Sequence, residues 1–398
     1  MFSSTLFLYI CIVKQQTRMA NTNLANAKTA KNDEFYTQYA DIQKEINAYL
    51  DYDPNVFRGK TVLLPCDDPE WSNFTKFFAQ NFELLGLKKL ISTSYAPESK
   101  RYKMPYQPTL FETQQPYFNP DKSKTNGKIF VLDRDMTGDN RINIEDLQWQ
   151  YLEGDGDFRS KEIRKLRDEA DIIVTNPPFS LFREFVAWIM EAGKKFLIIG
   201  NINAVSYKEI FPLIMENKIW TGNRFNERVN GKNMTFFVPD YYKMTGTELY
   251  IDDKGNKFIS VAGTGWFTNL EHGRRHAPLK LMTMAENFKY SKHKEIRGRK
   301  EYIHYENYDA IEVPFADAIP RDYEGIMGVP ISFISKYCPE QFEILGITDR
   351  GNQYGIKTKE YTPQDTPLYG DLNRRAAILV DGQLKSTYAR ILIRKKQP

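Results

Sequence analysis

Residues 171–180 read Asp-Ile-Ile-Val-Thr-Asn-Pro-Pro-Phe-Ser. The apolar run at 172–174 predicts a buried β-strand, and the strand has to end at the two prolines because proline cannot donate a hydrogen bond to a neighbouring strand. The residue before a proline also favours extended backbone. We therefore expect a rigid elbow at the carboxyl end of a buried strand, the edge at which open α/β sheets bind ligands.

The elbow presents an amide, a backbone carbonyl and an aromatic ring, from Asn176, Pro177, Pro178 and Phe179. These groups suit a planar ring with an exocyclic amine, because Asn176 and the Pro177 carbonyl can accept from the amine while Phe179 stacks on the ring. Two acceptors favour the pyramidal amine, whose lone pair is available, and stabilise the charge that develops on nitrogen. The pattern indicates methyl transfer to an amino nitrogen. The alternative is a plain strand followed by a Pro-Pro loop.

The stretches around the elbow alternate between strand-like and helix-like patterns, which indicates an α/β fold with a parallel, doubly wound sheet. The expected strands are 60–64, 90–94, 129–132, 171–175 and 195–200. The expected helices are 38–50, 74–85, 161–169, 181–192 and 207–217. Short β-rich stretches follow at 234–238, 247–251 and 257–262, and we expect them to form the antiparallel end of the sheet.

Three regions are expected along the chain. Residues 1–32 are predicted to be a disordered leader, residues 33–270 the catalytic domain, and residues 271–398 a separate α+β region. The last region holds 21 Lys and Arg against 17 Asp and Glu, an excess equal to the net charge of +4 of the whole chain. This placement favours contact between the last region and an acidic polymer.

The densest basic stretch is 289–300, which reads Lys-Tyr-Ser-Lys-His-Lys-Glu-Ile-Arg-Gly-Arg-Lys. Such a cluster suits backbone phosphates, and a solvated charged face is the alternative. The predicted DNA-binding residues are Arg274, Arg275, Lys292, Lys294, Arg297 and Arg299.

Cysteine and histidine usage indicates a reducing, cytoplasmic location without a metal site. The three cysteines are far apart, and neither they nor the four histidines have metal-ligand spacing. Residues 4–13 form an apolar stretch that is too short to span a bilayer, so no membrane association is expected. Residues 135–146 roughly follow a calcium-loop spacing. We interpret them as a polar turn, with calcium binding as the alternative.

The turn after strand 60–64 predicts the nature of the cofactor. It reads Pro-Cys-Asp-Asp-Pro and lacks the glycine-rich loop of nucleotide sites, while Asp67 and Asp68 offer two carboxylates. Carboxylates suit the cationic amine and sulfonium of S-adenosylmethionine and would repel a pyrophosphate. Further along, Asp157 and Phe158 stand where an acid and a ring could hold the adenine of that cofactor. The alternatives are helix capping by the two aspartates and an ordinary surface turn at 153–160.

The chain resembles the EcoRI-type adenine-specific DNA methyltransferases. The resemblance rests on Asp33-Glu34-Phe35-Tyr36-Thr37-Gln38-Tyr39, Cys66-Asp67-Asp68-Pro69, Gly154-Asp155-Gly156-Asp157-Phe158-Arg159-Ser160, residues 171–183 and residues 196–204. It implies a Rossmann-like, S-adenosylmethionine-dependent methyltransferase sheet, a C-terminal target-recognition region, and N6 methylation of an adenine flipped out of double-stranded DNA.

Carried over residue by residue, the resemblance gives the elbow as the catalytic motif. Phe35, Tyr36 and Thr37 become an N-terminal cofactor motif. The sequence departs from the wider class of amino-methyltransferases in lacking Gly-x-Gly after the first strand. It also has Ser94-Tyr95, and no acid, at the end of the second strand.

Two other classes of function stay open on the sequence. Asn-Pro-Pro-aromatic elbows also suit methyl transfer to RNA or to a glutamine amide of a protein, and a DNA-binding protein without catalysis is the third reading. We expect a monomer, with a cognate restriction endonuclease that acts separately as a possible partner.

Overall fold

The computed structural model describes residues 36–67, 72–97, 113, 118–225, 234–238, 249–349 and 356–397. Over these residues the chain divides into two compact units. Unit 1 spans Met1–Asn201 and Asn226–Leu270, and unit 2 spans Ile202–Phe225 and Glu271–Pro398.

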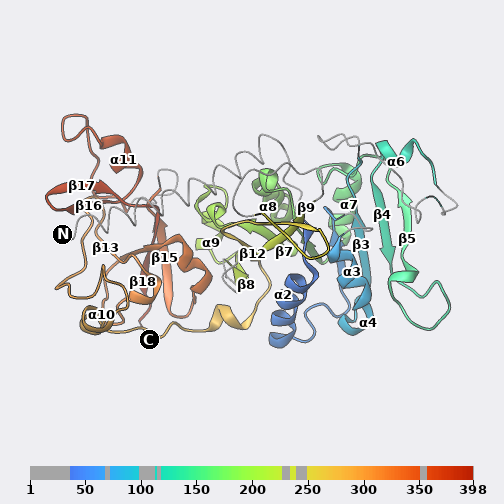
Figure 1. Cartoon of the computed structure of the whole chain (residues 1–398), viewed down its shortest axis with the longest axis horizontal. Coiled ribbons are helices and arrows are strands. Elements are labelled where there is room, and N and C mark those ends of the chain that lie inside the picture. The colour runs from blue at the N-terminus through green and yellow to red at the C-terminus, as the bar shows by residue number, and fades with distance from the viewer. Residues whose placement is uncertain are drawn as a thin grey trace. The chain divides into compact units, whose positions relative to one another are not determined.

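A large mixed sheet forms the centre of unit 1 (Figure 1). Its strands within unit 1 are β2 (Thr61–Leu64), β3 (Lys89–Thr93), β4 (Lys128–Leu132), β5 (Gln148–Tyr151), β6 (Ile172–Thr175), β7 (Lys195–Asn201) and β12 (Thr264–Thr268), in the order β5-β4-β3-β2-β6-β7-β12. Strands β3, β2, β6 and β7 are parallel. The predicted alternation of strands and helices is thus confirmed for the part of the sheet that carries the elbow.

Strand β4 differs from the parallel arrangement that we expected, because it pairs with β3 in the antiparallel sense. A parallel neighbour needs a crossover connection, usually a helix that returns the chain to the same edge. Within the described residues, the helix directly before β4 is α6 (Lys122–Thr125), which has only four residues.

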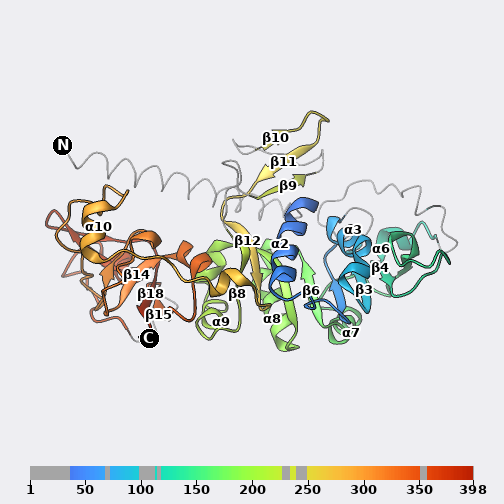
Figure 2. The same cartoon turned by 90° about the horizontal axis from the view of Figure 1, so that it is seen from below.

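Helices cover both faces of this sheet. Figure 2 shows α2 (Tyr39–Tyr52) and α3 (Asn73–Gln80) on one face, and α7 (Lys161–Glu169) and α8 (Phe182–Glu191) on the other. Serines start two of these helices, as their sequences suggest: Ser72 accepts from the backbone N–H of Phe74, and Ser160 accepts from that of Ile163. The short α4 (Phe82–Leu85) follows α3 and ends at Gly86 in left-handed conformation.

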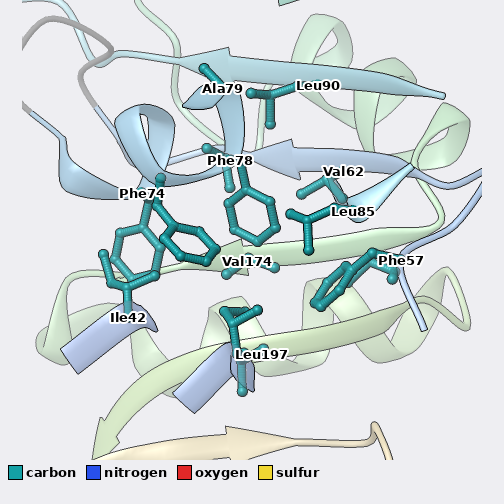
Figure 3. Close-up of a cluster of buried hydrophobic side chains, with 14 of the residues drawn as sticks. Ile42, Phe57, Val62, Phe74, Phe78, Ala79, Leu85, Leu90, Val174 and Leu197 are labelled. Carbon is teal, nitrogen blue, oxygen red and sulfur yellow. The ribbon is translucent and has the colours of Figure 1, made fainter. Parts of the chain in front are cut away.

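The core beneath α2 and α3 is rich in aromatic side chains. Figure 3 shows Phe74 and Phe78 of α3 directed at the sheet, where Val174 of β6 and Leu197 of β7 lie. All four side chains are almost completely buried. Burying such side chains stabilises the fold by about 1.5–3 kcal/mol each, so this packing holds the elbow strand firmly in place.

A second, separate sheet in unit 1 corrects one expectation. Strands β9 (Thr235–Val238), β11 (Lys257–Ser260) and β10 (Leu249–Ile251) do not extend the large sheet; they join β1 (Tyr36–Thr37) in the order β1-β9-β11-β10. Their aromatic rings pack on one another, with Tyr250 stacked on Phe258 at 4.9 Å between centroids. The antiparallel strand beside β7 is instead β12.

Unit 2 contains helices and two small sheets. Its first elements are η3 (Ile202–Ser206), α9 (Phe211–Met215) and β8 (Trp220–Phe225), followed by η4 (Gly273–His276) and α10 (Met284–Tyr290). The remaining elements are β13 (Ile311–Glu312), η5 (Ala316–Ala318), β14 (Met327–Pro330), η6 (Ile331–Lys336), β15 (Phe342–Ile347), α11 (Tyr369–Arg374), β16 (Ala377–Val380), β17 (Gln383–Ser386) and β18 (Arg390–Lys395). One sheet has the order β13-β14-β18-β15, and β16 and β17 form a hairpin.

Helix α9 is shorter than the predicted helix 207–217, because it begins at the turn that holds Pro212, a residue that fits only the first turn of a helix. None of the helices described is long and apolar enough to cross a membrane.

Candidate active site

The elbow lies where the sequence predicted it, at the carboxyl end of a buried parallel strand. Every residue of β6 is buried, and the chain passes through Asn176, Pro177 and Pro178 into the short η2 (Phe179–Leu181) and then α8. Pro177 is buried, whereas Asn176 and Phe179 are half-buried. The amide and the ring are therefore supported by protein on one side and accessible on the other.

The amide of Asn176 is oriented by the N-terminal strand. Its nitrogen Nδ2 donates to Thr37 Oγ1 at 3.4 Å, and Thr37 is buried. The backbone carbonyl of Thr37 in turn accepts from Asn73 Nδ2 at 2.8 Å, so β1 is tied to the first turn of α3. The hydrogen bond to Thr37 uses the amide nitrogen, so the acceptor role predicted for Asn176 falls to its carbonyl oxygen.

Asp67 lies at the end of β2 and is 6 % exposed. Both of its carboxylate oxygens accept from hydroxyl groups of the protein: Oδ1 from Ser72 Oγ at 2.7 Å and Oδ2 from Thr175 Oγ1 at 2.6 Å. Its backbone carbonyl accepts from Ser92 Oγ at 2.9 Å. Asp67 thus joins the ends of β2, β3 and β6 to the start of α3. The predicted cofactor residues Phe35 and Asp68 lie outside the described residues.

Asp157 and Phe158 are neighbours with different surroundings. The carboxylate of Asp157 is paired with the guanidinium of Arg159, with Nε and Nη2 at 2.9 and 2.7 Å. These hydrogen bonds hold the pKa of Asp157 below its usual range. The ring of Phe158 is buried and packs edge-on against Phe185 and Trp188 of α8. That ring is engaged in the core on the α8 side of the sheet.

The segment 154–157 is folded closely against the end of β3. The backbone N–H of Ala96 donates to the Asp155 carbonyl at 2.8 Å. A side chain at Gly156, whose φ is +83°, would bring its Cβ to 2.2 Å from the Ser94 carbonyl oxygen. Burial raises the pKa of the Tyr95 phenol, and the carboxylates of Asp155 and Asp157 raise it further.

Strand β3 has no acid at its own end, and the carboxylates near that end belong to Asp155 and Asp157 of the neighbouring loop. Sequence reasoning missed Asp155, Thr175 and Ser72. The signal for Asp155 was the pair of glycines at 154 and 156, since closely spaced glycines indicate close backbone approach. No local signal pointed to Thr175.

The carboxylates of the calcium-like stretch bind backbone N–H groups. Asp135 accepts from Gly138 and Asn140, and Asp146 accepts from Met136, Thr137 and Asn143. These bonds make the polar turn that we expected. Across the described parts of the chain, no group of three or more His, Cys, Asp or Glu is placed to hold a metal ion.

The predicted DNA-binding residues fall into two groups in unit 2. Lys294, Arg297 and Arg299 form the first group together with Lys292, which is paired with Asp317 at 2.8 Å. Lys294, Arg297 and Arg299 are exposed, and so is the Lys292 side chain outside its ion pair.

The second group lies on η4. The Arg274 side chain is half-buried and donates to the Asn223 carbonyl. Arg275 is buried, with its guanidinium 3.7 Å from the centre of the Trp220 ring and 3.2 Å from a Glu271 oxygen. This guanidinium is held inside unit 2, while the 292–299 group reaches solvent.

The donor set in unit 1 fits a cationic cofactor. Carboxylates of Asp155 and Asp157 lie near the carboxyl end of β3, and Arg159, a cation beside them, is already paired with Asp157. This chemistry suits the amine and sulfonium of S-adenosylmethionine and would disfavour a pyrophosphate.

Comparisons with known proteins identify the class. A family model described as adenine-specific methyltransferase EcoRI matches residues 23–396. The chain is 43% identical over 325 residues to Type II methyltransferase M.EcoRI of Escherichia coli, covering 82% of this chain and 89% of that protein. It is 34% identical over 377 residues to Type II methyltransferase M.MpnI of Mycoplasma pneumoniae, covering 93% and 97%. No solved structure gives a significant match.

The mixed α/β sheet, the elbow and these matches define the chain as a methyltransferase. It belongs to the EcoRI family of adenine-specific methyltransferases. The family predicted from the sequence motifs is confirmed.

Proposed function

We propose that this enzyme transfers the methyl group of S-adenosylmethionine to the N6 atom of an adenine flipped out of double-stranded DNA, as the modifying enzyme of a restriction-modification system. The observation that carries the proposal is the elbow at the end of β6, with the Asn176 amide directed by Thr37. Both relatives described above are named Type II methyltransferases.

The residues of the elbow act on the amine. The Asn176 and Pro177 carbonyl oxygens accept from its two protons, which localises the lone pair on nitrogen, and Phe179 stacks on the flipped base. When bound, S-adenosylmethionine supplies an electrophilic methyl group on a positively charged sulfur. With both amine protons held by Asn176 and the Pro177 carbonyl, the nitrogen lone pair would be available to that methyl group, and one of the two protons would be lost on transfer.

The cofactor would lie across the carboxyl ends of the parallel strands β3, β2 and β6, in a Rossmann-like arrangement. Tyr36 and Thr37 would border it from β1, and Asp155 and Asp157 from the loop beside β3, while Asp67 joins the ends of β2 and β6. Phe158 supports that loop from within the core.

Residues 271–398 would recognise the target. We propose phosphate contacts by Lys294, Arg297 and Arg299, which carry positive charge on one short stretch. The enzyme would act as a cytoplasmic monomer, and a cognate restriction endonuclease would act separately.

The direct test is transfer of labelled methyl groups from S-adenosylmethionine to duplex DNA, total RNA and protein, followed by nucleoside analysis. We expect N6-methyladenine in DNA alone. Label that appears only in RNA or in protein glutamine would replace the proposal with one of the other two methyl acceptors.

The elbow itself is tested by Asn176→Ala. Removing one preorganised polar group of this kind costs about 10²–10³ in rate. Single-turnover methylation should fall by that factor, while calorimetry should show unchanged affinity for S-adenosylmethionine. A single-turnover rate near that of wild type would remove Asn176 from the mechanism.

A further inference from the structure

Asp67 is placed to act on the elbow through Thr175. Thr175 is the last residue of β6 and directly precedes Asn176, and it is completely buried. Its hydroxyl donates to Asp67 Oδ2 at 2.6 Å, across 108 residues of sequence. The backbones of β2 and β6 pair at Val62–Ile172 and Leu63–Ile173. The Asp67–Thr175 bond therefore holds the two strands together beyond their last paired residues, where the elbow begins.

The second oxygen of Asp67 holds the opposite side of the same edge. Ser72 Oγ donates to Asp67 Oδ1 at 2.7 Å and also accepts from the Phe74 N–H at the start of α3. The next residue, Asn73, donates to the carbonyl of Thr37, whose hydroxyl accepts from Asn176. One buried carboxylate thus lies at the junction of two routes to the elbow, one through Thr175 and one through α3 and Thr37.

We propose that Asp67 is a positioning residue for the elbow, and that its hydrogen bonds, rather than its charge, are what the reaction needs. This inference rests on the proposed function and deepens it. A carboxylate that already accepts two short hydroxyl hydrogen bonds while 6 % exposed is committed to the protein frame. Displacing the elbow by about 1 Å would cost on the order of a hundredfold in rate, because transfer requires alignment of the reacting atoms.

Substitutions at Asp67 and Thr175 distinguish an effect of their hydrogen bond from an effect of the Asp67 charge. Asn at position 67 can accept from one hydroxyl with its oxygen and donate to the other with its nitrogen, since a hydroxyl does both. Asp67→Asn therefore keeps the two hydrogen bonds and loses the charge. Thr175→Val keeps the shape of the side chain and loses one hydrogen bond, whereas Thr175→Ser keeps the hydroxyl.

A matched control lies on the neighbouring strand. Thr93 is also completely buried, ends β3, and donates from its hydroxyl to the Pro65 carbonyl at 3.2 Å. Thr93→Val removes a buried threonine hydrogen bond at the same edge of the sheet without touching Asp67.

The experiment measures single-turnover methylation of duplex DNA, S-adenosylmethionine affinity by calorimetry, and melting temperature for all four variants. We expect Thr175→Val to lower the rate by about tenfold to a hundredfold with cofactor affinity unchanged. Asp67→Asn, Thr175→Ser and Thr93→Val should stay within about threefold of the wild-type rate.

Two results would overturn the inference: a wild-type rate for Thr175→Val, or a large loss of cofactor affinity in Asp67→Asn with the rate at saturating cofactor unchanged. The second result would make Asp67 a charge partner of the cofactor. If Thr175→Val does not fold, Ser72→Ala, which removes the hydrogen bond to the other oxygen of Asp67, takes its place with the same expected loss of rate, and a wild-type rate for it would overturn the inference. Failure of the proposed function looks different, because the wild-type protein itself would then leave adenine in DNA unmethylated.

Discussion

Two consecutive residues of the elbow are fixed by partners from other parts of the chain. Thr175 donates to Asp67, and Asn176 donates to Thr37, 139 residues away in sequence. Both partners are buried. A side chain that is held by a buried partner loses little further entropy when a substrate binds, so these bonds would prepare the amide for the proposed contact with the target amine.

Phe179 gives the prediction at this scale. Stacking of a base on an aromatic ring is worth about 1–3 kcal/mol. Phe179→Ala should therefore lower kcat/KM for DNA by about 5- to 150-fold, while Phe179→Tyr keeps the ring and most of the activity. Phe179 also packs partly against the core, so melting temperatures must accompany the steady-state kinetics. Equal activity of the two folded variants would show that the ring does not hold the target base.

The role proposed for each elbow residue followed from local signals, and the role proposed for its partners did not. An apolar run before two prolines specifies a strand end wherever it occurs, which is why Asn176 and Phe179 were found from the sequence. Asp67 was expected to face the cofactor because a carboxylate suits its positive charge. Nothing near Asp67 in the sequence reveals that Thr175 lies beside it. The buried Phe158 ring shows the same limit, since its neighbours come from α8.

Among the elements, the loop 154–157 depends most strongly on glycine. Gly156 has φ +83°, and a Cβ there would lie 2.2 Å from the Ser94 carbonyl oxygen, which is part of the backbone and cannot rotate away. The loop presents Asp155 and Asp157 at the end of β3, so its position and the proposed cofactor site are coupled.

Gly156→Ala should therefore lower both the melting temperature and the affinity for S-adenosylmethionine. Gly138→Ala is the matched control, because Gly138 has φ +77° but no heavy atom within 4 Å of the position that a Cβ would take. Both variants carry the cost of a left-handed alanine, about 1–2 kcal/mol. Only Gly156→Ala adds the clash. Similar calorimetric affinities and melting temperatures for the two variants would mean that the loop adjusts freely.

Element types were easier to predict than element partners. The buried strands and the helices that start at Ser72 and Ser160 have clear local patterns. The assignment of β9, β10 and β11 to the large sheet was wrong because strand pairing is set by distant residues. Their partner β1 lies far earlier in the chain, with Tyr36 opposite Phe237. No pattern in the sequence indicates that these distant segments pair.

On the scale of the whole molecule, the predicted phosphate contacts and the elbow belong to different units. The elbow is in unit 1, and the cluster Lys294, Arg297 and Arg299 is in unit 2. Contacts with phosphates are independent of sequence and release counterions, so they can be measured separately from catalysis.

Changing Lys294, Arg297 and Arg299 together to Gln should weaken binding to specific and random duplexes alike. Each lost phosphate contact should flatten the slope of log affinity against log salt by roughly one unit. Lys292→Gln should change the slope less, because Asp317 already pairs with Lys292 at 2.8 Å. Exposed lysines of unit 1 serve as the control in a triple variant at Lys44, Lys122 and Lys124. An unchanged slope for the unit 2 triple variant would mean that Lys294, Arg297 and Arg299 do not contact phosphates and form an ordinary solvated surface.

The long sequence separation between the elbow and its partners also bears on when the enzyme becomes active. Bringing residues 37 and 67 to residues 176 and 175 closes chain segments of 139 and 108 residues, and that entropy is recovered only as the sheet around them assembles. A chain that has not yet formed this sheet contains the elbow residues but lacks the bonds that orient the Asn176 amide. The proposed activity would therefore require the assembled sheet as well as the elbow residues.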